Sequence, residues 1–189
     1  MRLPLLPKSD LTPDQAALYG GFYTRASAKA SLFRTIGEDG ALLGPWSVWL
    51  HTPSVGEPLR QMIEAIGALP GLSVTAAQAV TLATVAHFDA AYEIQAHAAQ
   101  LKAAGLSDGQ IAALVAGDMP PGLDEETTTA VEVARRLLAG GVLPAPLHRR
   151  AVTVLGQDGL AAIVYLVGQY CLVAACLNAY DVPSEEPTS

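Results

Sequence analysis

Charged residues are scarce in this sequence: they make up 15% of the 189 residues, against 51% for hydrophobic residues. The charges are also unbalanced, and the net charge of −7 argues against nucleic acid or an anionic membrane as a partner. A surface with so little charge indicates that part of it is covered by another subunit. We therefore expect a homo-oligomer that binds neither nucleic acid nor a membrane.

Cysteine is nearly absent, since only Cys171 and Cys176 occur, both in an apolar run. Two cysteines do not form a disulfide framework, so a reducing cytoplasm is the expected compartment. The apolar part of residues 1–10 is too short for a signal peptide. If both cysteines lie in one helix, their Cα atoms are about 8.5 Å apart, which exceeds the reach of a disulfide. We interpret them as packing residues.

Motifs for metals and nucleotides are missing as well. The four histidines have no zinc-ligand spacing, and the sequence has no glycine-rich phosphate loop, no G-x-S-x-G and no H-E-x-x-H. We expect neither a metal nor an organic cofactor.

Helix signals recur along the chain, and no segment alternates polar and apolar residues as a strand does. Capping boxes predict helix starts at Thr12, Thr75 and Ser107, and the glycine pairs 20–21 and 140–141 predict helix ends. The sequence predicts an all-α, single-domain bundle of about eight helices over residues 1–189, with an N-terminal extension at 1–40 and a core at 41–183.

The last predicted helix, from Asp158 to about Tyr180, is uncharged after its first residue. Its length alone permits a membrane span. Because polar residues such as Gln169 and Asn178 interrupt it, we interpret it as a buried central helix, with the membrane span as the alternative.

The chemically richest stretch is AHFDAAYEIQAHAAQLKAAGLSDGQIAA, residues 86–113. We expect Asp89 to cap a helix that begins at Ala90 and stops at Gly105. Glu93 and His97 then lie one turn apart, on or beside an apolar stripe. Two titratable groups turned toward a core cost free energy unless they are paired or used. The pair is therefore either a proton-transfer site or an ordinary i,i+4 ion pair, which is only weakly stabilising.

The other polar candidates have plain structural interpretations. His87 ends a predicted helix, where a protonated imidazole suits the helix dipole, although it is only a short turn from the pair. Gln78 is expected at the third position of the Thr75 capping box, where a capping role explains it. His51 and His148 are expected at the surface or at a boundary.

The segment HFDAAYEIQAHAAQLKAAGLSDGQIAAL, residues 87–114, resembles the carboxymuconolactone decarboxylase-like family of the alkylhydroperoxidase D-like superfamily. GPWSVWLHTP resembles the family's segment ahead of the core, and LVGQYCLVAACLNAYDVP resembles its closing helix and exit. The resemblance implies an all-α alkylhydroperoxidase D-like fold assembled as trimers or hexamers, with active sites beside the motif helix.

The sequence also departs from the family. The peroxidase branch has a C-x-x-C pair four and seven residues before the motif histidine, where this chain has Glu93 and Ala90. Its disulfide chemistry therefore does not carry over. Where the family often has an Arg-Glu pair, this chain has Ala77 and Gln78. Glu93 and His97 alone match the decarboxylase-like pattern.

The resemblance implies a cofactor-free lyase that acts on a small carboxylated lactone or a related acid. His97 is then the general acid or base, and Glu93 orients it and stabilises its charged form. Further pocket candidates are His87, Tyr92 and Gln78. The candidate cations for a substrate carboxylate are Arg34, Arg60, Arg149 and Arg150. The alternatives are a non-catalytic oligomeric helical protein of the same fold and, third, a thiol-dependent alkylhydroperoxidase.

Overall fold

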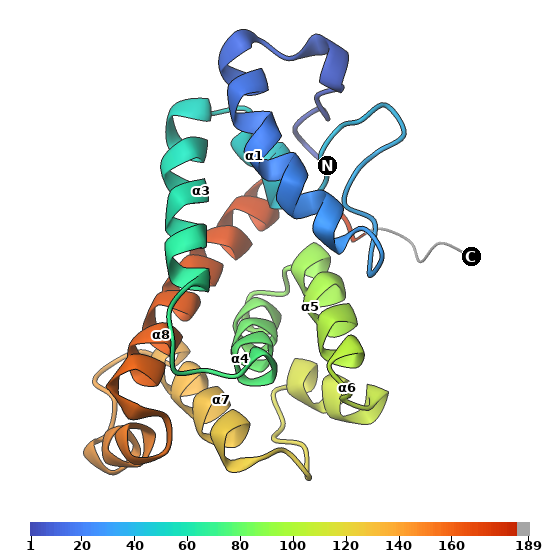
Figure 1. Ribbon diagram of the computed structural model, residues 1–189. Helices are drawn as coiled ribbons and strands as arrows, with labels where there is room; N and C mark the ends of the chain where they lie inside the picture. The colour runs from blue at the N-terminus through green and yellow to red at the C-terminus, as the bar shows by residue number, and fades with distance from the viewer. Residues whose placement is uncertain (185–189) are drawn as a thin grey trace.

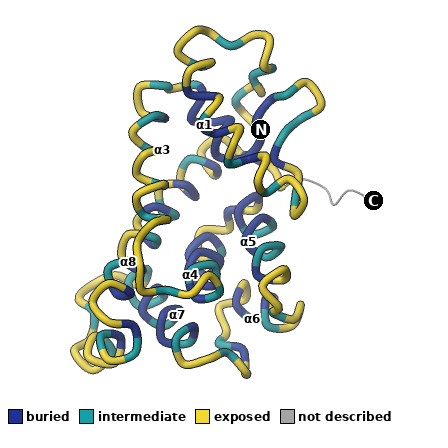
Figure 2. The backbone as a smooth tube through the Cα atoms, viewed as in Figure 1, coloured by how far each residue is buried: buried dark blue, intermediate teal, exposed yellow. Residues whose placement is uncertain are grey.

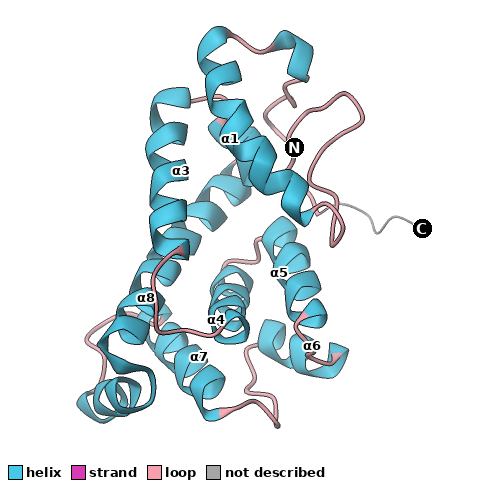
Figure 3. Ribbon diagram, viewed as in Figure 1, coloured by secondary structure: helices cyan, strands magenta, loops and turns pink. Residues whose placement is uncertain are grey.

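The computed structural model describes residues 1–184, and this part of the chain contains eight α-helices and one 3₁₀ turn, Lys8–Asp10 (Figure 1). The helices are α1 (Pro13–Lys29), α2 (Pro45–Trp49), α3 (Pro53–Gly67), α4 (Val74–His87), α5 (Ala91–Ala103), α6 (Asp108–Ala116), α7 (Glu125–Leu138) and α8 (Ala145–Ala179). Within residues 1–184 there is no strand, only one isolated antiparallel bridge between Ile36 and Leu42 (Figure 3). The predicted all-α class and the expected number of helices are confirmed.

Two of the three predicted capping boxes form. Thr12 caps α1 together with Gln15, and Ser107 caps α6 together with Gln110. In each box the hydroxyl accepts from a backbone N–H and the glutamine side chain accepts from the N-cap N–H, so that two unpaired donors are satisfied.

The third predicted box, at Thr75, is wrong. The side chain of Ser73 caps α4 instead, accepting from the N–H of Ala76 at 3.2 Å. The helix therefore begins before Thr75, and Gln78 is free to serve another purpose. The expected cap at Asp89 is wrong too: this residue has a φ of 55° in the turn after α4, and the N-cap of α5 is Ala90.

Helix α1 does not stop at the glycine pair 20–21 but continues to Lys29. Glycine costs about 1 kcal/mol relative to alanine inside a helix. Burial of Leu18, Phe22 and Ala26 on one face of α1 outweighs that cost. Gly21 also leaves room for a neighbour, since a Cβ there would lie 2.6 Å from Cδ of Arg60 on α3.

Helix α4 lies at the centre of the fold and packs against α5, α6, α7 and α8 (Figure 1). Its backbone is mostly buried, whereas α3 is largely exposed (Figure 2). A helix that is covered on several sides has no wet face, which explains why α4 carries no charged residue.

The long helix α8 bends at Gly156, whose φ of 70° is not helical. It packs against α2, α3, α4 and α7. By length and composition α8 is apolar enough to cross a membrane, and 44% of its most apolar 18-residue window is buried within the fold.

Candidate functional site

The two residues singled out by spacing, Glu93 and His97, lie side by side on the buried face of α5. Nε2 of His97 is 3.1 Å from Oε2 of Glu93, and their side chains are 2% and 7% exposed for His97 and Glu93 respectively. On the other side of the imidazole, Nδ1 lies 2.6 Å from Oε1 of Gln78 on α4. The three side chains form a polar row, Glu93, His97, Gln78, in which the first two are buried and Gln78 is partly exposed.

The ring of Tyr170, from α8, packs edge-on against His97, with centroids 5.0 Å apart and an interplanar angle of 89°. Burial raises the pKa of Tyr170, and the negative charge of Glu93 adds to the increase. The phenol is therefore neutral at pH 7 and forms a fixed wall beside the imidazole.

Burial also governs the charge of His97. It lowers the pKa of the imidazole below its usual value of 6.5, while the hydrogen bond and charge of Glu93 oppose the decrease and Lys29 adds to it. At neutral pH the imidazole is therefore uncharged and carries one proton, on either Nδ1 or Nε2.

That single proton has two positions. With Gln78 as placed, its amide oxygen accepts from Nδ1–H, and Nε2 faces Oε2 of Glu93. If the Gln78 amide turns over, its NH₂ donates to Nδ1, and Nε2–H donates to Glu93. A turn of one amide thus accompanies a change of the imidazole between its two neutral tautomers.

The pair borders a cavity of about 50 Å³. Its walls come from α1, α2, α3, α5 and α8 and from Phe33 between α1 and α2; they are Arg25, Lys29, Phe33, Pro45, Trp46, Trp49, Ile63, Tyr92, Glu93, Ala96, His97, Gln100, Gln169, Tyr170 and Val173. A second cavity of about 250 Å³ adjoins it, because Arg25, Lys29, Ile63, Gln169 and Tyr170 line both. Gln78 and Thr81 border the second cavity.

The cations at the site are Arg25 and Lys29 of α1, which the sequence interpretation missed. Burial lowers the pKa of Lys29, Glu93 opposes the decrease and Arg25 adds to it, so the three charges lie near one another. Arg25 and Lys29 are four residues apart, which places them on one face of a helix. This spacing was not recognised because α1 was expected to end near Gly20.

None of the four arginines predicted to hold a substrate carboxylate lines either cavity. Arg60 forms ion pairs with Glu57 and Glu64, and Arg150 pairs with Glu132. Arg34 and Arg149 are exposed.

The remaining candidates separate into two groups. Tyr92 lines the 50 Å³ cavity, and its hydroxyl donates to the backbone carbonyl of Arg34 at 3.2 Å. His87 is exposed, stacks edge-on with Phe88 and borders a different cavity, near Arg135. Among residues 1–184 no group of three or more His, Cys, Asp or Glu side chains is placed to hold a metal ion.

The two cysteines lie on α8, away from the pair. Both are free thiols of intermediate exposure, and neither lines the two cavities described above. Burial raises the pKa of the Cys171 thiol, which disfavours the reactive thiolate.

Comparison with known proteins gives a family and a fold. The model of the Carboxymuconolactone decarboxylase family matches residues 53–136, a segment that contains Gln78, Glu93 and His97 but not α1 or α8. No curated protein matches the chain.

Two solved structures of the debrominase Bmp8 share the fold. The apo form aligns with a TM-score of 0.71 at 12% identity, covering 96% of this chain and 91% of that one. A cysteine-to-alanine variant of that debrominase in complex with 2,3,4-tribromopyrrole aligns with a TM-score of 0.72 at 12% identity, covering 98% and 92%.

Proposed function

The chain belongs, over residues 53–136, to the carboxymuconolactone decarboxylase family, and from this premise we propose that it is a cofactor-free lyase acting on a small carboxylated lactone or a related acid. The observation that carries the proposal is the polar row of Glu93, His97 and Gln78 beside a cavity that also holds two cations. A buried acid–base pair next to a space for a small anion is the arrangement that proton transfer to carbon needs.

The proposed reaction needs one proton and no redox partner. The bond between the substrate carbon and its carboxylate breaks, CO₂ leaves, and the electron pair remains on carbon, delocalised into the lactone carbonyl. A proton from the Glu93–His97 pair then bonds to that carbon. Because both ring nitrogens of His97 face protein groups, Glu93 is the member of the pair that meets the substrate, and His97 supplies and stores the proton behind it.

Thiol chemistry has less support. The debrominase variant replaces a cysteine, but in this chain Cys171 and Cys176 do not line the cavity that holds Glu93. The remaining alternative is a non-catalytic protein of the same fold, in which the Glu93–His97 pair is only structural.

Turnover separates these alternatives. Carboxymuconolactone and related small acids are incubated with the purified protein, and CO₂ release and substrate loss are followed. We expect His97→Ala to lower the rate by about 10²-fold or more, the usual contribution of a positioned general acid or base. Glu93→Gln, which keeps the size of the side chain, should also slow turnover. Circular dichroism controls for folding, and unchanged rates in both variants would assign the pair to structure alone.

A further inference from the structure

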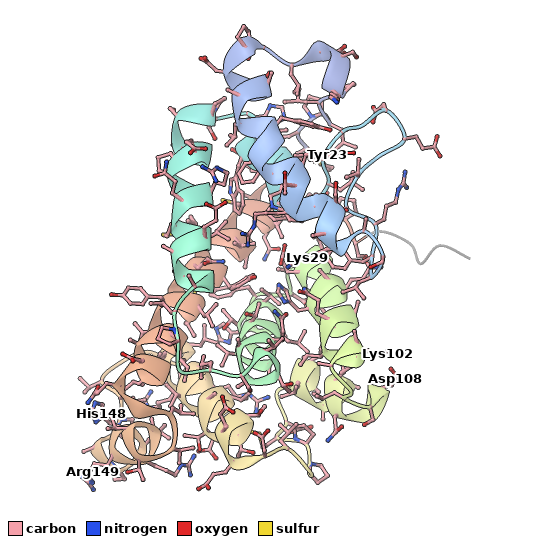
Figure 4. The ribbon with its side chains drawn as sticks, in the orientation of Figure 1. Tyr23, Lys29, Lys102, Asp108, His148 and Arg149 are labelled. Atoms are coloured by element: carbon pink, nitrogen blue, oxygen red, sulfur yellow. The ribbon has the colours of Figure 1, made fainter. Side chains whose placement is uncertain are left out.

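Two cations of α1 reach the site without a hydrogen bond or a close ion pair. Arg25 and Lys29 line both the 50 Å³ and the 250 Å³ cavity. Neither side chain forms a hydrogen bond or an ion pair with another residue of the described chain. Figure 4 shows Lys29 near the end of α1, above α4 and α5. Charged groups that are half-buried and unpaired are costly in a purely structural role.

The charges around the smaller cavity do not balance. Glu93 is the one carboxylate among its lining residues, and burial keeps His97 neutral, whereas Arg25 and Lys29 are both cations. The larger cavity is lined by the same two cations and by no Asp or Glu. One positive charge is left over, so the site favours an anion with a single charge.

Two neutral polar groups at the same cavity also lack partners. Gln169 is 7% exposed, its Oε1 is buried without a hydrogen bond, and its amide bonds to no described residue. Trp49 is 3% exposed, and its indole Nε1 is buried without an acceptor. Each unpaired buried group costs about 1–3 kcal/mol, and a hydroxyl, which both donates and accepts, can satisfy the two together.

The cavity sizes fix where the ligand's groups lie. A space of about 50 Å³ holds only a few waters, at roughly 10–15 Å³ for each. Groups that meet Arg25, Lys29, Gln169 and Trp49 inside it must therefore be on neighbouring atoms. The adjoining 250 Å³ cavity has apolar walls that suit the rest of the molecule; they are Ile63, Ile66, Leu69, Leu72, Val74, Ala77, Ala162 and Leu166.

We propose that the site binds a small 2-hydroxy acid with an apolar body. Arg25 and Lys29 bind its carboxylate, and Gln169 and Trp49 bind the adjacent hydroxyl, while the body occupies the larger cavity. The inference rests on the function proposed above, since it describes how the acid that lies against Glu93 is recognised. As a substrate such an acid also needs a carbonyl that accepts the electron pair left by CO₂; mandelate has none and serves as a probe of binding alone. It adds three elements outside the family-matched segment, α1, α2 and α8, to the binding site.

Isothermal titration calorimetry at pH 7.5 tests the ligand class on the wild-type protein. Mandelate has the carboxylate, the hydroxyl and an apolar ring; phenylacetate lacks only the hydroxyl, and mandelamide lacks only the charge. We expect mandelate to bind about fivefold or more tightly than phenylacetate, and tenfold or more tightly than mandelamide. Equal binding of the three, or no binding of mandelate, overturns the proposal.

Variants test the residues. Arg25→Gln, Lys29→Gln and Gln169→Met should each weaken mandelate binding, the first two by about tenfold or more. Gln169→Met should bring mandelate down to the affinity of phenylacetate, while phenylacetate itself is unaffected. Arg149→Gln is the matched control, because Arg149 is an exposed cation far from Lys29 (Figure 4). If Arg25→Gln and Lys29→Gln bind mandelate as tightly as Arg149→Gln does, the assignment of the carboxylate site is wrong.

These experiments can contradict the binding proposal and the lyase proposal independently of each other. Glu93→Gln removes the negative charge beside the bound carboxylate and should bind mandelate at least as tightly as the wild type, although it slows turnover. Selective mandelate binding without turnover of any acid contradicts the lyase and supports the binding site, whereas turnover of carboxymuconolactone without mandelate binding does the reverse.

Discussion

The amide oxygen of Gln78 lies 2.6 Å from Nδ1 of His97, across a sequence separation of 19 residues. This contact ties the central helix α4 to the motif helix α5 at the point where the acid–base pair is buried. Because Gln78 can accept or donate as its amide turns, it satisfies the imidazole whichever nitrogen holds the proton. A residue expected to cap a helix, and also proposed as a pocket candidate, is thus the third member of the polar row.

The first prediction concerns this contact. Gln78→Glu places a carboxylate against Nδ1, and the added negative charge should raise the pKa of His97. Gln78→Leu removes the shorter contact of Nδ1 and leaves only the Nε2 of Gln100 at 3.4 Å, so it should cost about 1 kcal/mol of stability. NMR titration of the imidazole and urea unfolding measure the two effects. Gln157→Glu, at an exposed position of α8, is the control and should leave the pKa of His97 unchanged.

The second prediction is a pH dependence of stability. Because burial lowers the pKa of His97 in the folded protein, the unfolded chain binds this proton more readily. The wild type should therefore lose stability as the pH falls below about 6.5, by at most about 1.4 kcal/mol per pH unit from this group, and should lose none of it above that pH. Urea unfolding at pH 7.5 and pH 5 should give a smaller difference for His97→Gln. Equal differences in both proteins would contradict the assignment.

The third prediction concerns the thiols. The double variant Cys171→Ser/Cys176→Ser should keep the ligand binding and turnover of the wild type, because neither residue borders the cavity beside Glu93. Wild-type Cys171 should react slowly with iodoacetamide at pH 7, since burial raises its pKa. Hydroperoxide consumption that depends on these thiols would favour the peroxidase alternative.

The fourth prediction concerns a close backbone approach that positions α8. A Cβ on Gly159 would lie 2.5 Å from the carbonyl oxygen of Gly71, which itself has a φ of 93°. Gly159→Ala should therefore destabilise the fold by about 1–3 kcal/mol, the usual cost of overpacking. Gly109→Ala is the control: it lies in α6 with open space around it and should be neutral or slightly stabilising. Thermal unfolding of the two variants measures the difference.

The sequence predicted the helices wherever local chemistry decides. The capping boxes at Thr12 and Ser107 and the spacing of Glu93 and His97 are short-range features, and the structure has each of them. The family resemblance rests on the same local motif, and the match over residues 53–136 confirms it.

The errors arose where tertiary packing decides. Ser73 and Thr75 are both chemically able to cap α4, and only the position of the helix in the core selects Ser73 and directs Gln78 to His97. The glycine pair 20–21 is a local stop signal, but α1 continues because its apolar face is buried. The cations beside the cavity were missed for that reason, since the continued helix is what carries Arg25 and Lys29 toward Glu93 of α5.

The last prediction is that the protein is a homo-oligomer with α8 at the contact. Helix α8 exposes two adjacent large apolar side chains, Val164 at 47% and Tyr165 at 56%, and a third, Leu172 at 40%, about two turns further along. No charged residue follows Asp158 in this helix, so nothing on that face disfavours apolar contact with a second copy.

Light scattering at micromolar concentration should give a mass that is a multiple of 19.6 kDa. Tyr165→Glu/Leu172→Glu should convert the oligomer to a monomer, because each carboxylate would be buried without a partner. Val142→Glu is the control, since Val142 is 88% exposed but lies outside the helices. A wild-type monomer, or an oligomer that survives the double substitution, would exclude this face of α8 as the contact.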